Sequence, residues 1–173
     1  NIALSKIGTF LGSSITNFDI DNVFSSLYDI YEIKLKNLDF VDGQNNSWYM
    51  RFIDGSGSVV SSSTYSSAGT NWRTDSDSWG YQNAQNDITY GNIGFAGGYS
   101  DDMEGQTDIR IFNPYDSNIY TQTYSEIVSW HSSGFAYIYR MANVEKTKQS
   151  IRGVRLYANA NFANVEAEVW GYA

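Results

Sequence analysis

The sequence predicts an all-β protein, an antiparallel β-sandwich of roughly eight to ten strands joined by long loops. Apolar and polar residues alternate over residues 151–157 and 165–170, whereas a helix would need apolar residues at intervals of three and four. Aromatic residues make up 16% of the 173 positions, and such side chains suit a pleated, half-buried surface. Gly, Ser and Asn gather between the patterned segments, as is typical of polar loops.

Four segments with apolar residues stand out before residue 60, and alternation of apolar and polar residues predicts strands for the last three of them. In chain order they are residues 1–11, 17–21, 28–38 and 48–53. The first segment fits an edge strand or an arm that reaches to a neighbouring molecule equally well. Asp54-Gly55-Ser56-Gly57, after the fourth strand, is a strong hairpin signal.

The middle of the chain, residues 61–102, is rich in Ser, Asn and Gly and has weak periodicity. A structureless loop of this length is uncommon in a compact domain. We therefore expect one or two short strands there, around residues 70–74 and 89–95.

Regular alternation returns in the last part of the chain. The strands predicted there are residues 107–112, 120–130, 135–141, 151–157 and 165–170. We interpret the last two as a half-buried antiparallel pair with a short polar step between them, and Gly153 as a bulge.

The domain organisation follows from length and spacing. A chain of 173 residues fits one domain, and no internal repeat or interior linker divides it. We expect an amino-terminal arm or edge strand at residues 1–14 and a single jelly-roll β-sandwich at 15–173, because uneven strand spacing favours a jelly roll over a plain meander.

Charge and composition restrict the partners. The formal net charge is −8, with 11 basic residues scattered among 19 acidic ones, so neither nucleic acid nor an anionic membrane surface is an expected partner. A cation-bridged acidic glycan stays open. The chain contains no Cys, which excludes disulfides and thiolate metal sites. No stretch approaches the roughly 20 apolar residues of a membrane-spanning helix.

Catalytic and metal-binding patterns are weak. His131 is the single histidine and no Gly-x-Ser-x-Gly motif exists, so we predict no catalytic residues and interpret His131 as a turn-edge imidazole. A carboxylate pair is the remaining enzymatic route, with Glu104 and Glu126 as the first residues to test. Asp75-Ser76-Asp77 and residues 101–104 fit turns better than calcium ligands, although a loop calcium ion stays open. We predict no metal and no cofactor.

Aromatic side chains in the weakly patterned middle form the candidate ligand-binding set. They are Trp72, Trp79, Tyr81, Tyr90 and Tyr99. If exposed together, these rings and the nearby Asn, Asp and Gln would make a sugar-stacking surface. The interpretation we favour is that they pack loops onto the sandwich or fill a subunit interface.

Several segments together resemble a family of jelly-roll domains in tailed-bacteriophage virion proteins, found in fibres and as capsid decoration or cement proteins. They are Phe24-Ser25-Ser26-Leu27-Tyr28-Asp29-Ile30-Tyr31-Glu32-Ile33 with residues 48–53, Ile109-Arg110-Ile111-Phe112-Asn113-Pro114-Tyr115-Asp116-Ser117, residues 151–157, Asn161-Phe162 and Glu168-Val169-Trp170-Gly171-Tyr172. The resemblance has a gap through residues 61–104. The family tends to have Leu-Tyr-Gly where this chain has Val169-Trp170-Gly171.

The resemblance implies a non-enzymatic structural role on a virion surface, after assembly in the host cytoplasm, since the family has no shared catalytic residues to carry across. The implied partners are other virion proteins and copies of the chain itself, commonly as a homotrimer. The arm at residues 1–14 is our candidate for the contact with neighbours, through Ile2, Leu4, Ile7 and Phe10. The alternatives are a carbohydrate- or receptor-binding module of a fibre tip, with a host-surface glycan as partner, and a glycan hydrolase.

Overall fold

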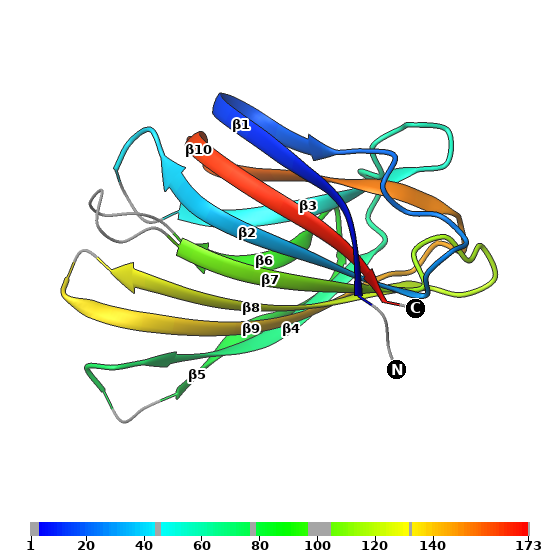
Figure 1. Cartoon of the computed structure of the whole chain (residues 1–173). Helices are drawn as coiled ribbons and strands as arrows, with labels where there is room; N and C mark the ends of the chain where they lie inside the picture. The colour runs from blue at the N-terminus through cyan, green and yellow to red at the C-terminus, as the bar shows by residue number, and fades with distance from the viewer. Residues whose placement is uncertain (1–3, 44–45, 77–78, 97–104, 132, 173) are drawn as a thin grey trace.

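The described part of the chain folds into strands and contains no helix, as the sequence predicts. The computed structural model describes residues 4–43, 46–76, 79–96, 105–131 and 133–172, and within these ranges all regular elements are strands (Figure 1). They are β1 (Leu4–Ile20), β2 (Ile30–Phe40), β3 (Asn46–Asp54), β4 (Tyr65–Arg73), β5 (Trp79–Ile88), β6 (Gly91–Ala96), β7 (Gly105–Phe112), β8 (Thr121–His131), β9 (Phe135–Glu145) and β10 (Ile151–Tyr172).

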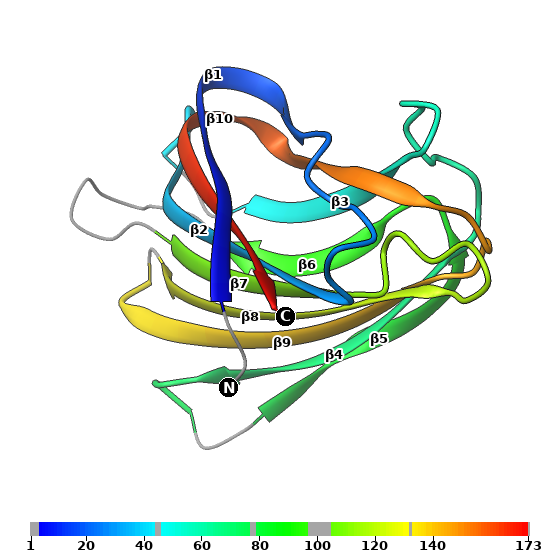
Figure 2. The same ribbon diagram turned by 45° about the vertical axis from the view of Figure 1, so that its right-hand side comes forward.

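The strands form one antiparallel sheet that curls into two facing layers (Figure 2). The sheet order is β5-β4-β9-β8-β7-β2-β10-β3-β6, with β1 beside β10. Strand β10 belongs to both layers, because residues 151–158 pair with β3 and residues 162–172 pair with β2. Strand β1 accompanies β10 from the pair Leu4–Tyr172 to the pair Ile20–Val154. The larger layer is therefore β5-β4-β9-β8-β7-β2, and the smaller one is β3 with β6.

The prediction of two closing strands that pair with each other is wrong. Residues 151–172 form one strand, and its two halves pair with β3 and β2 instead. The polar step at residues 158–161 contains neither Gly nor Pro, and β1 stays paired on both sides of it, so the chain bends without reversing. The predicted bulge at Gly153 is confirmed by a register shift after Ile151. A Cβ atom at Gly153 would overlap the carbonyl oxygen of Ile20.

Two further predictions need correction. Residues 61–96 contain three strands, β4, β5 and β6, where one or two were expected. The inward positions of β4 include Ser67 and Gly69, whose side chains give no apolar alternation for sequence reasoning to detect. At the other end, residues 1–11 and 17–21 were expected as separate segments, but β1 runs continuously through Ser14 and is part of the sheet.

The core lies between the layers and is built from side chains of both. Its largest fully buried members are Trp48, Tyr31, Tyr65, Phe40, Phe52 and Phe162. Tyr65 stacks on Phe52 with ring centroids 6.1 Å apart. The Tyr65 hydroxyl accepts the Phe52 N–H at 2.9 Å and donates to the Val60 carbonyl at 3.1 Å, which fixes the β3–β4 connection to the core. Burial raises the pKa of Tyr65 well above its usual range, so this hydroxyl keeps its proton.

A buried polar cluster joins β6 to the larger layer. The Asn143 amide on β9 donates to the Asn92 carbonyl at 3.0 Å and to the Thr123 hydroxyl at 3.1 Å. The Ser67 hydroxyl on β4 donates to the Asn143 side-chain oxygen and accepts the Asn92 N–H at 3.1 Å. The backbone N–H and carbonyl of Asn92 on β6 are thus satisfied by side chains of the larger layer, which removes the cost of burying them unpaired.

Replacing Asn143 tests this cluster. The change Asn143→Leu keeps a similar volume but leaves the buried Asn92 carbonyl without its partner. We expect it to lower the free energy of unfolding by about 2–4 kcal/mol, measured by urea denaturation. The matched control is Asn159→Leu at an exposed position of β10, with an expected change under about 0.5 kcal/mol. Equal effects of the two substitutions would contradict the assignment.

Candidate functional site

Strand β1 provides a long free edge with apolar side chains in solvent. Within the described residues it pairs with β10 only, so its outer backbone edge has no strand partner. Leu4, Ile7 and Leu11 are 46%, 37% and 76% exposed. An edge strand with exposed aliphatic residues is a template for association with another chain.

The predicted contact residues of the amino-terminal arm differ in their exposure to solvent. Leu4 and Ile7 lie at the surface as expected, but Phe10 packs against the core. Ile2 lies outside the described residues. Sequence reasoning did not single out Leu11, the most exposed aliphatic side chain of this strand, because it follows directly after Phe10 and breaks a simple alternation.

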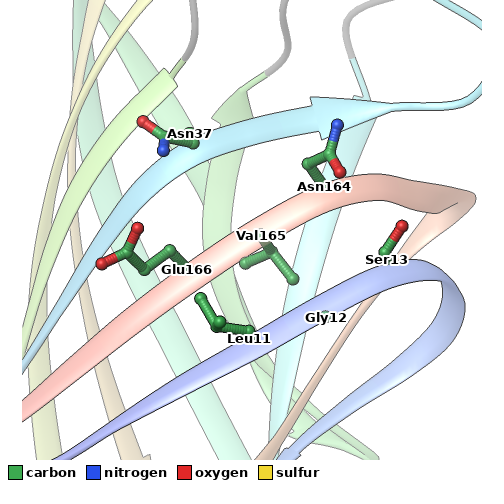
Figure 3. A pocket seen from close by; sticks show the side chains of 7 residues that line it. All are labelled: Leu11, Gly12, Ser13, Asn37, Asn164, Val165 and Glu166. Carbon is green, nitrogen blue, oxygen red and sulfur yellow. The ribbon is translucent and has the colours of Figure 1, made fainter.

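A hollow of about 480 Å³ lies beside this edge, where β1 and β10 pass from one layer to the other (Figure 3). It is lined by Leu11, Gly12, Ser13, Asn37, Asn164, Val165 and Glu166. The backbone is irregular here. Ser14 and Asn37 both have a φ of 54°, and the β10–β2 register shifts on both sides of Asn164. Such bulges re-aim side chains, which places polar groups beside an exposed leucine.

Ion pairs cross the outer face of the larger layer and fix β1 to it. The Glu168 carboxylate on β10 lies 2.8 Å from Lys6 Nζ on β1 and 3.2 Å from Lys36 Nζ on β2. Hydrogen bonds from Lys6 and Lys36 lower the pKa of Glu168 to about 2. One carboxylate therefore links three neighbouring strands at neutral pH.

A second carboxylate, Glu32, is buried on the same face. Burial alone would raise its pKa, but the Tyr172 hydroxyl at 2.6 Å, Lys34 at 3.4 Å and Arg110 at 3.5 Å together hold the pKa below its usual value. The arrangement joins the end of β10 to β2 and β7. Because its partners surround it on the sheet surface, Glu32 acts as a structural anion.

Two carboxylates face each other farther along this surface. Asp108 on β7 and Glu126 on β8 are register partners, a pairing that like charges disfavour. Lys34 Nζ lies 3.6 Å from Asp108, and Arg140 Nε donates to Glu126 at 2.7 Å, which compensates both charges. Both residues line shallow grooves of about 170 and 380 Å³. Glu104 lies outside the described residues, so the hydrolytic pair Glu104–Glu126 stays a prediction.

The five predicted sugar-stacking rings are only partly described. Trp72 lies on β4, with the Arg140 guanidinium 5.2 Å from the ring centroid. Tyr90 packs against Tyr49 of β3, with ring centroids 4.6 Å apart. The backbones of Trp79 and Tyr81 lie on β5, but their side chains, like the whole of Tyr99, fall outside what the structure describes. The structure places Trp72 in the larger layer and Tyr90 beside the smaller one, and a common stacking surface stays a prediction.

His131 has the environment expected of a turn-edge imidazole. Its Nδ1 accepts the Ser133 N–H at 3.0 Å, and its ring stacks on Phe135 with centroids 4.6 Å apart. The Asp75 carboxylate accepts two hydrogen bonds from Arg73, at 2.9 and 2.6 Å. Asp75 is the one carboxylate of the predicted turn at residues 75–77 that lies within the described residues, and Arg73 is its partner.

Neither metal-ligand geometry, membrane-spanning helices nor similarity to known proteins assigns a function to the described part of the chain. Among the described residues, no group of three or more His, Asp or Glu side chains is placed to hold a metal ion. No helix in the described part of the chain is long and apolar enough to cross a membrane. No family model, curated protein or solved structure matches the chain.

The link through Glu168 predicts a pH-dependent stability. The folded pKa is lower than the unfolded value near 4.5, so the stabilisation is fully present above pH 4.5 and is lost as the pH falls towards 2. Glu168→Gln should therefore lower the urea midpoint at pH 7, and the difference from the wild-type protein should shrink between pH 4.5 and 2. A difference that is the same at pH 7 and pH 2 would contradict this role.

Proposed function

We propose that the chain is a non-enzymatic structural protein on the surface of a bacteriophage virion, either a capsid decoration protein or a fibre domain. The sandwich holds copies of itself, or neighbouring virion proteins, through β1 and presents its loops outward. The observation that carries the proposal is the free aliphatic edge of β1. The motifs that resemble virion jelly-roll domains support the setting, and a trimer is the assembly which that resemblance implies.

The contacts of β1 are suited to this role. Lys6 and Glu168 tie the strand to the sheet, so a partner would meet a fixed surface and little ordering would oppose association. The outer backbone edge of β1 offers hydrogen bonds to an incoming strand. Leu4, Ile7 and Leu11 would lose solvent contact, and full burial of one such side chain contributes about 1.5–3 kcal/mol.

Self-association through β1 can be tested with two matched leucines. Leu11 and Leu27 are both 76% exposed, but Leu27 lies in the β1–β2 connection. We expect the wild-type protein to sediment as a trimer, Leu11→Lys to shift it to a monomer because the charge would be buried, and Leu27→Lys to leave the trimer intact. A wild-type monomer at high concentration would contradict the proposed assembly.

The same variants test the virion setting. In particles purified from the phage that encodes the chain, mass spectrometry should detect peptides of the wild-type and Leu27→Lys proteins. Leu11→Lys should be depleted from the particles but present in the lysate. Absence of the wild-type chain from intact particles would contradict the virion part of the proposal.

A further inference from the structure

One end of the sandwich carries exposed aromatic side chains on connections that touch each other. The β1–β2, β7–β8 and β9–β10 connections meet there, on the right in Figure 1. Tyr115, Ile119 and Tyr120 of the β7–β8 connection are 44%, 39% and 45% exposed. From the sequence, Asn113-Pro114-Tyr115-Asp116 was interpreted as part of a motif shared with virion jelly-roll domains and not as a binding site.

Two depressions flank this connection, and Asn113 lines both of them. The first, of about 250 Å³, is lined by Ser25, Ser26, Tyr28, Asp29, Asn113, Tyr115 and Asp116. The second, of about 510 Å³, is lined by Phe112, Asn113, Asn118, Ile119, Tyr120, Gln122 and Lys148. Each depression therefore combines a half-exposed tyrosine with several hydrogen-bonding groups.

Tyr115 is presented on a backbone that hydrogen bonds hold in place. The Asn113 N–H donates to the Asp29 carbonyl at 2.6 Å, and the Pro114 carbonyl accepts the Ile151 N–H at 2.7 Å. The Tyr115 carbonyl accepts the Ser150 hydroxyl at 2.9 Å. Three successive residues are thus anchored to the two neighbouring connections. A ligand that stacks on these rings would therefore bind with little loss of conformational entropy in the loop.

Polar groups around the rings remain available. Within the described part of the chain, the carboxylates of Asp29 and Asp116 form no ion pair, unlike the carboxylates of the outer sheet face. Asp116 does accept hydrogen bonds from the Asn118 backbone and side-chain amides, at 2.8 and 3.0 Å, which orders the turn. On the other side, Lys148 Nζ lies 6.0 Å from the centroid of the Tyr120 ring.

The alternation of rings and hydrogen-bonding groups identifies the class of ligand. A protein-docking patch has an apolar centre with a polar rim, whereas here every exposed ring has carboxylate, amide or ammonium groups directly beside it. A sugar unit presents a C–H face to a ring and hydroxyl groups at its edge. Carboxylates accept hydrogen bonds from hydroxyl groups, and amides both donate and accept them. A formal net charge of −8 disfavours acidic sugars.

We propose that this end of the molecule binds a neutral oligosaccharide of at least two units, one in each depression. Tyr115 and Tyr120 stack on the sugar rings. Asp29, Asp116 and Lys148 bond to the hydroxyl groups. The site differs from the predicted set around Trp72, and it does not depend on the virion role or on association through β1.

The test uses the full chain on an array of oligosaccharides built from neutral hexoses, N-acetylhexosamines and deoxyhexoses, with uronic and sialic acid glycans for comparison. The best neutral oligosaccharide is then titrated against ¹⁵N-labelled protein. We expect binding to neutral glycans, with shifted amide signals confined to residues 113–120 and the connections beside them. Tyr115→Ala and Tyr120→Ala should each weaken binding about tenfold or more, because each removes a stacking face.

The matched control is Tyr124→Ala, since Tyr124 is 37% exposed but lies on the outer face of β8. It should bind as the wild-type protein does. Absence of any neutral glycan on the array, binding restricted to acidic glycans, or unchanged affinity in both Tyr115→Ala and Tyr120→Ala would overturn the proposal. The proposal would also be overturned if the protein self-associated with increasing concentration, Tyr120→Ala abolished this association, and added saccharide changed neither protein.

Discussion

The sandwich depends on one strand that takes part in both layers. Strand β10 pairs with β3 in its first half and with β2 in its second, while β1 follows it across the bend. Val154 and Leu156 face the core from one half, and Val165, Ala167 and Val169 do so from the other. Because β1 and β10 pair on both sides of the bend, the two layers are parts of one sheet. Strands β2 and β3 are placed by this continuity, and the remaining strands follow from their own pairing to these two.

Where backbone pairing ends, buried side chains complete the closure. Strand β6 is the last in the sheet order, and its far edge faces Ser67, Asn143 and Ser125 of the larger layer. Polar residues in a core are normally unfavourable, but these satisfy backbone groups that no strand reaches. The same need explains why β4 carries a buried serine, Ser67, at an inward position. The loops that carry Tyr115 and Tyr120 then project from a closed scaffold.

The sequence predicted more of the fold than of the candidate sites. Alternation identified the all-β class and the inward face of β3 at Trp48, because burial on one face leaves a period of two. It missed the continuity of β10, because the polar step at residues 158–161 resembles a turn and its partner β1 is about 140 positions away. Exposure of Leu4 and Ile7 was expected from an arm. The exposure of both Tyr115 and Tyr120 at one end of the sandwich was not, because sequence does not show which connections meet at one end.

The most direct test of the shared strand is native-state hydrogen exchange of the β10 amides. If β10 holds both layers in one cooperative unit, the amides of residues 153–157 and 165–171 should exchange with the same opening free energy, equal to that of global unfolding. They should also respond together to low concentrations of denaturant. Exchange of one half at a clearly lower free energy than the other would show that the layers open independently, and would contradict the account.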